Sequence, residues 1–130
     1  MGTFNKAENI TIDRIQSATS RLETELGLSG FLEIEHIFDP GVDSETNTPP
    51  YAMTSPNWHY RSGLIRWYLQ PVCLLTDDEL EQVIIHEYVH ILVHPITQLI
   101  SSDDLTHREE YSVESIARAI CHARGMKNIH

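Results

Sequence analysis

One segment constrains the fold more than any other, an apolar run over residues 83–93 that carries several titratable side chains. It follows Thr76-Asp-Asp-Glu79, a capping box in which the threonine and glutamate side chains each bind the other residue's backbone N–H. Acidic residues in the first turn also suit the positive end of a helix dipole. Pro95 predicts the end, because the residue before a proline avoids helical backbone angles. The sequence therefore predicts a long apolar helix from Thr76 to about Val93.

Three polar side chains interrupt this helix in the pattern His86-Glu87-x-x-His90. Residues four apart lie on one face of a helix, so the two imidazoles can bind one Zn²⁺ at about 2.0–2.1 Å. Glu87 is one step around the helix, where its carboxylate can act as general base on a metal-bound water. Polar groups in so apolar a run need partners or a ligand. We therefore predict one zinc ion per chain, with Glu87 as the catalytic residue.

A zinc site with two histidines needs another protein ligand and an open coordination position. His94 is excluded, because eight residues of continuous helix place it about 12 Å along the axis from His86. A second acidic helix is predicted at about residues 106–124, and it contains Glu110 and Glu114. These two glutamates face the same way, so the spacing alone leaves open which of them binds the metal.

The two helices together resemble those of the gluzincin zinc metallopeptidases. In that family a glutamate on a later helix is the third ligand, and an acidic residue four places on hydrogen-bonds a ligand histidine. The segment Glu110-Tyr-Ser-Val-Glu114 matches that pattern, so the resemblance implies Glu110 as ligand and Glu114 as partner of a histidine. The resemblance to the gluzincins covers residues 58–124. The two helices are also similar to those of short metallopeptidase-like proteins of bacteriophages and prophages.

Other periodic segments define the expected fold class. Residues 9–28 have helical spacing, 31–38 alternate as in a strand, and 58–69 are rich in aromatic and β-branched residues. Residues 43–56, rich in Ser, Thr, Asn and Pro, are predicted as a surface loop. We expect a single α+β domain over residues 1–130, with a minimal zincin-like fold. It would have an N-terminal helix, a small twisted sheet of about three strands and two metal-bearing helices.

The strand predicted at 58–69 has two possible roles. In the zincin families the last strand before the metal helix lines the cleft and binds an extended peptide by backbone pairing, and this strand takes that place by resemblance. The other role is that of a core strand with buried aromatic side chains, and the two roles are compatible. The sequence does not choose the residue that stabilises an oxyanion, and the candidates are Tyr60, Tyr68, Tyr111, His59 and His107.

Charge and composition exclude several classes of protein. The formal net charge of −10 disfavours binding to phosphate backbones, so we expect no nucleic-acid partner. No apolar run approaches the roughly 18 residues needed to span a membrane, and the N-terminal residues lack a signal-peptide pattern. We therefore expect a cytoplasmic protein in which Cys73 and Cys121 are reduced, buried thiols.

The predicted function is zinc-dependent hydrolysis of peptide bonds in a peptide or protein substrate. Large gluzincins have a second domain that forms the other wall of the cleft, and this 130-residue sequence contains none. That difference leads to one alternative, a zincin-fold module that binds zinc without catalysis and acts through a partner. A further alternative is that the His-Glu-x-x-His pattern binds no metal.

Overall fold

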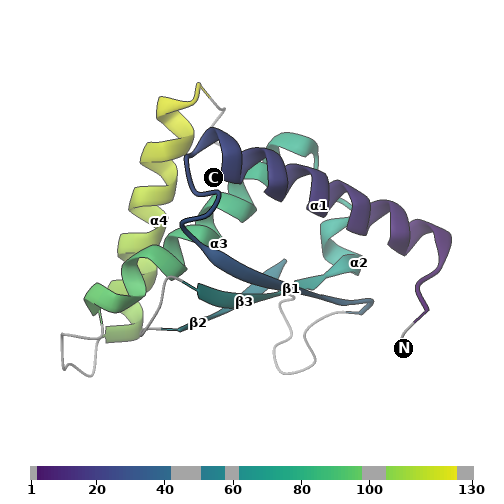
Figure 1. Ribbon diagram of the computed structural model, residues 1–130, viewed down its shortest axis with the longest axis horizontal. Helices are drawn as coiled ribbons and strands as arrows, with labels where there is room; N and C mark the ends of the chain where they lie inside the picture. Colours follow the sequence, from purple (N-terminus) through teal and green to yellow (C-terminus); the bar gives the residue numbers. More distant parts are fainter. Residues whose placement is uncertain (1–2, 42–50, 58–61, 98–104, 126–130) are drawn as a thin grey trace.

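The computed structural model describes residues 3–41, 51–57, 62–97 and 105–125 (Figure 1). The expected α+β class is confirmed, with four helices and a three-stranded sheet in the described part of the chain. In chain order the elements are α1 (Lys6–Glu25), β1 (Glu33–Asp39), β2 (Ala52–Asn57), β3 (Ser62–Tyr68), α2 (Leu69–Val72), α3 (Asp77–Thr97) and α4 (Leu105–Ala123).

The sheet has the order β1-β3-β2, in which β3 is parallel to β1 and antiparallel to β2. Ile65 and Trp67 of β3 are fully buried, as expected of a central strand rich in aromatic and β-branched side chains. The strand β2 is consequently an edge strand, paired with β3 along one side.

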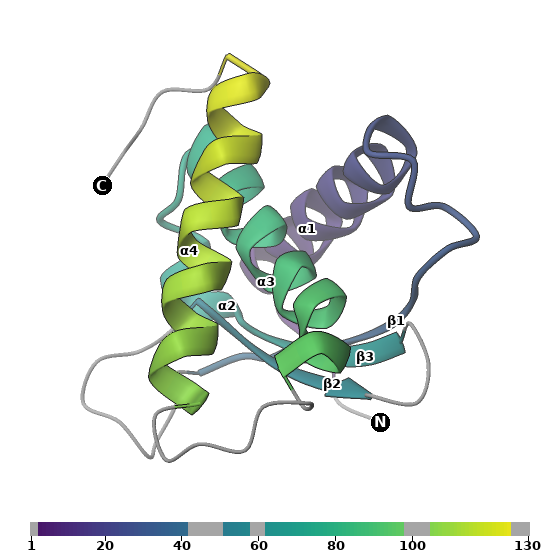
Figure 2. The ribbon, with the colours of Figure 1, turned by 90° about the vertical axis from the view of Figure 1, so that its left-hand side faces the viewer.

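The described helices lie on one face of this sheet (Figures 1 and 2). The helix α3 is the centre of the packing, since it contacts β2, β3, α1 and α4. It comes close to the sheet at Gly63, where an added Cβ would lie 3.1 Å from Cδ1 of Ile91. A glycine at this position therefore allows α3 to rest directly on β3. Five side chains of α3 are fully buried in the core: Leu80, Ile84, Ile85, Tyr88 and Val89.

The ends of the helices follow the local sequence signals. The predicted capping box is present, with Thr76 N–H donating to Glu79 Oε1 at 2.8 Å and Glu79 N–H to Thr76 Oγ1 at 3.2 Å. The N-terminal helix begins earlier than expected, because Asn5 is its N-cap and forms the same reciprocal pair with Glu8 of the first turn. Gly125 follows α4 with a φ of 76°, a left-handed conformation that glycine adopts without strain.

Two further predicted boundaries are wrong. The helix α3 continues to Thr97, so Pro95 lies in its last turn. Proline has no backbone N–H, so the helix loses one hydrogen bond at this position. That loss costs less free energy than the packing of α3 against its neighbours contributes. The loop expected over 43–56 becomes strand β2 from Ala52 onward, while residues 43–50 are outside the described part. Polar residues and Pro56 resemble a loop locally, but pairing with β3 supplies hydrogen bonds and an edge strand tolerates proline.

The two cysteines differ in their exposure to solvent. Cys121 is buried as expected, whereas Cys73 is exposed, and both are free.

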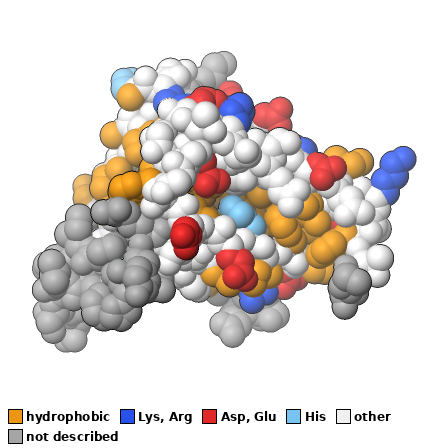
Figure 3. Space-filling view, viewed as in Figure 1, with side chains coloured by type: hydrophobic (Ala, Val, Ile, Leu, Met, Phe, Trp, Pro, Cys, Tyr) orange, Lys and Arg blue, Asp and Glu red, His pale blue; other side chains and the backbone are white. Residues whose placement is uncertain are grey.

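In the described ranges no helix combines the length and the apolar character needed to cross a membrane. Acidic side chains are spread over the face in Figure 3, and the described part of that face shows no continuous patch of Lys and Arg.

Candidate metal centre

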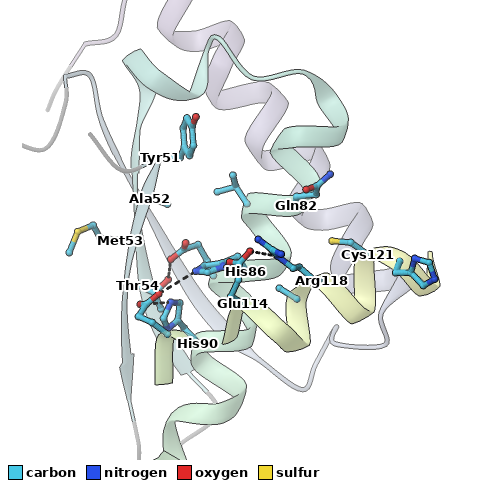
Figure 4. Close-up of a pocket in the computed structure, with 15 residues that line it drawn as sticks. Tyr51, Ala52, Met53, Thr54, Gln82, His86, His90, Glu114, Arg118 and Cys121 are labelled. Carbon is cyan, nitrogen blue, oxygen red and sulfur yellow. Dashed lines mark hydrogen bonds and ion pairs between the residues drawn. The ribbon is translucent and has the colours of Figure 1, made fainter. Parts of the chain in front are cut away.

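The two histidines of the His-Glu-x-x-His pattern lie side by side on α3. The ring centroids of His86 and His90 are 5.0 Å apart, and the ring planes meet at 72°. Both side chains line a cavity of about 530 Å³ bounded by α3, α4 and the strand β2 (Figure 4). The spacing of four residues thus places two imidazoles on one wall of one cavity.

The helix α4 runs back along α3 and brings Glu110 to the same point. Glu110 Oε1 lies 3.2 Å from Nε2 of His90, and Oε2 lies 3.8 Å from Nε2 of His86. One ligand atom from each of the three residues lies within 4.8 Å of the other two. Ligands bound to one tetrahedral zinc at about 2.1 Å are ~3.4 Å apart, and two imidazoles with a carboxylate are a donor set that zinc favours. The residues present therefore fit this metal.

Glu114 lies behind His86, on the side away from Glu110. Glu114 Oε2 is 3.1 Å from His86 Nδ1, and Arg118 Nε donates to Glu114 Oε1 at 2.8 Å (Figure 4). Burial lowers the pKa of His86, which favours the neutral imidazole, and Nδ1–H can then donate to the Glu114 carboxylate. Its Nε2 lone pair is then left for a metal. The geometry thus favours Glu110 as the ligand and Glu114 as the partner that orients His86.

Removing the Glu114 carboxylate is expected to weaken zinc binding without eliminating it. In Glu114→Ala the His86 ring loses its orienting acceptor, so zinc affinity should fall about 10–100-fold. Competition with a chromophoric chelator measures this change. Glu35→Ala, which removes an exposed carboxylate of β1 outside the cavity, is the control and should bind zinc as the wild type does. Unchanged affinity in Glu114→Ala would contradict the orienting role.

Glu87 faces the strand β2 and is nearly enclosed, with 7% of its surface exposed. The hydroxyl of Thr54 donates to Glu87 Oε1 at 2.6 Å. Burial raises the pKa of Glu87 to about 8, and the nearby charge of Glu110 acts in the same direction. In the metal-free protein this carboxyl is therefore largely neutral at pH 7. A cation bound nearby would favour its ionised form.

The strand that lines the cavity differs from the predicted one. The lining residues of the sheet run from Tyr51 to Thr54, beside and within β2, whereas β3 is paired on both edges and has no free edge for a peptide. For the described residues of β3 the predicted cleft-lining role is therefore wrong, whereas the predicted core role holds. Residues 58–61 of the predicted strand lie outside the described part. Strand order depends on tertiary contacts, so no signal near residue 54 reveals that it faces Glu87.

Of the oxyanion candidates from the sequence, the two that the structure describes are not brought to the cavity. Tyr68 is buried elsewhere, and Tyr111 is 78% exposed without lining the cavity. His59, Tyr60 and the side chain of His107 lie outside the described part. The polar lining residues that the sequence analysis missed are Tyr51, Thr54, Gln82, Arg118 and His122. Of these, Arg118 had a readable signal, since it follows Glu114 by four residues in a helix.

Comparisons with known proteins do not add a family to this geometry. No protein-family model matches the chain, and neither curated proteins nor solved structures give a significant match. The function is therefore inferred from the donor atoms, the burial and the contacts of the cavity itself.

Proposed function

We propose that the protein is a zinc-dependent hydrolase of peptide bonds with a minimal zincin-like fold. One observation carries the proposal: the donor atoms of His86, His90 and Glu110 converge within 4.8 Å, in the same cavity as the buried Glu87 carboxyl. His86, His90 and Glu110 would hold the metal, and Glu114 would keep the His86 ring in place. Convergence of a zinc donor set and a buried acid is one arrangement that can hydrolyse an amide.

Each residue has a defined task in this proposal. Bound zinc supplies a Lewis acid that makes a water molecule acidic near neutral pH and polarises a carbonyl. Glu87 accepts a proton from the attacking water and delivers it to the departing amine as the C–N bond breaks. Burial raises the pKa of this carboxyl to about 8 in the metal-free protein. Zinc bound beside it would lower that pKa and favour the ionised form that accepts a proton.

The strand β2 supports a peptide as the substrate. Its outer edge is unpaired among the described strands, and residues 51–54 line the cavity beside the metal ligands. An extended peptide can add to such an edge through backbone hydrogen bonds. This pairing would place a peptide carbonyl next to the cluster of donor atoms.

A second candidate is a zinc-binding module without catalysis that acts through a partner. The environment of Glu87 favours it, because burial keeps this carboxyl largely neutral in the metal-free protein, and one of its oxygens already accepts a hydrogen bond from Thr54. In this alternative zinc would bind, but no water molecule would be activated for attack.

The two candidates are separated by one set of assays on zinc-loaded protein. Hydrolysis of a mixture of quenched fluorescent peptides is expected, with loss on chelation and recovery when zinc is restored. A peptide hydroxamate, which binds an open metal position, should raise the melting temperature of the zinc form alone. Zinc binding without cleavage and without a hydroxamate effect would instead support the non-catalytic module.

A further inference from the structure

The sheet reaches Glu87 through a hydrogen bond from the side chain of Thr54. Thr54 pairs with Ile65, whose side chain is fully buried on the helix-covered face of the sheet, so Thr54 faces α3 as well. Its hydroxyl donates to Glu87 Oε1 at 2.6 Å, at the short end of the range for O–H···O hydrogen bonds. An edge strand and the metal helix are thus joined at the proposed catalytic carboxyl.

We infer that Thr54 is a positioning residue, which holds Oε1 of Glu87 and leaves Oε2 free for the attacking water. The inference rests on the proposed function. A glutamate carboxyl rotates broadly about its last side-chain bond, so without an anchor it samples many orientations. A carboxylate has lone pairs on both oxygens, so a donor to one oxygen leaves the other available. Thr54 therefore reduces the orientational freedom of the base before substrate arrives.

Thr54 is well placed to orient Glu87, because both residues lie in regular secondary structure. Thr54 lies within the ladder between β2 and β3, and Glu87 lies ten residues into α3. The close approach at Gly63 holds α3 against the same sheet. A site built on strands and helices keeps its geometry better than one built on loops. The hydroxyl of Thr54 is consequently fixed relative to Glu87.

Three variants test the positioning role through kinetics of the zinc-loaded enzyme. Thr54→Val keeps the shape and removes the hydroxyl, and kcat should fall about 10–100-fold, while KM and zinc content stay unchanged. Thr54→Ser keeps the hydroxyl and should retain most of the activity. The matched control is Ser55→Val, which changes the next residue of β2, opposite Leu64 and outside the cavity lining, and should leave kcat unchanged.

A measurement without activity tests the contact itself. In zinc-free protein, Thr54→Val should lower the melting temperature by a few degrees, because the enclosed Glu87 loses its hydrogen bond. In a Glu87→Leu background, which has no acceptor, the same change should have little effect. The difference between the two backgrounds is the coupling between the residues.

The outcomes separate this inference from the proposed function. Absence of coupling overturns the inference whether or not the wild type is active. Coupling together with an unchanged kcat in Thr54→Val, or an equally low kcat in Thr54→Ser, also overturns it. A zinc-loaded wild type that hydrolyses no peptide overturns the proposed function, and Thr54 would then be a structural anchor of Glu87 without a catalytic role.

Discussion

Glu87→Gln is expected to abolish hydrolysis while the protein still binds one zinc ion. Glutamine has nearly the same shape, but it cannot accept the proton of the attacking water. Loss of a positioned general base costs about 10²–10⁴-fold in rate. The metal ligands are unchanged in this variant, so zinc content measured beside kcat separates loss of the base from loss of the site. A Glu87→Gln protein as active as the wild type would refute the proposed mechanism.

The same substitution is expected to stabilise the zinc-free protein. Burial raises the pKa of Glu87 from 4.5 to about 8, so the folded state keeps a proton that the unfolded chain releases above pH 4.5. Stability therefore falls as pH rises from about 4.5 to 8, and at pH 7 the cost is on the order of 3 kcal/mol. Glutamine does not titrate and removes this loss.

Urea unfolding of the zinc-free proteins at several pH values measures the effect. The stability advantage of Glu87→Gln over wild type should grow between pH 5 and 8. Glu35→Gln, a change at an exposed glutamate of β1, should show no such trend. Parallel pH profiles for wild type and Glu87→Gln would contradict the raised pKa of the buried carboxyl.

Glu110→Ala is expected to weaken zinc binding by more than the 10–100-fold typical of an orienting residue. The carboxylate contacts both imidazoles, at 3.2 Å from His90 and 3.8 Å from His86, and its removal leaves two protein ligands. A loss of affinity of about 100-fold removes ~2.7 kcal/mol of the stabilisation that excess zinc provides, so the melting temperature with zinc should also fall.

Isothermal titration of metal-free protein with zinc gives the affinity for this comparison. The Glu110 side chain is 56% exposed, so the metal-free variant should unfold at the wild-type temperature. Glu114→Ala should show a smaller loss than Glu110→Ala. The reverse order would exchange the two roles and make Glu114 the metal ligand.

Local interactions explain why much of the fold was predictable. The capping box at Thr76 and Glu79 involves residues three apart, so the start of α3 is encoded within four positions. The strand β2 is different, because Pro56 and its polar neighbours have a loop-like composition and form a strand only through pairing with β3. The end of α3 is also set by packing, which outweighs the local effect of Pro95.

The candidate site was also predictable where local interactions decide the geometry, and not where tertiary packing decides it. Helical spacing places His86 and His90 together before any tertiary structure is known. The choice between Glu110 and Glu114 depends on how α4 packs along α3, so the spacing alone left it open. The position of Thr54 requires strand order and register as well, and these are set by contacts distant in sequence.

The zinc content of the purified wild-type protein tests the central claim most directly. Metal-free protein is incubated with excess zinc, passed through a desalting column and analysed for metal and protein. We predict about one zinc ion per chain, held by His86, His90 and Glu110. A protein that retains no zinc after this treatment would contradict the metal centre, and the proposed hydrolase with it.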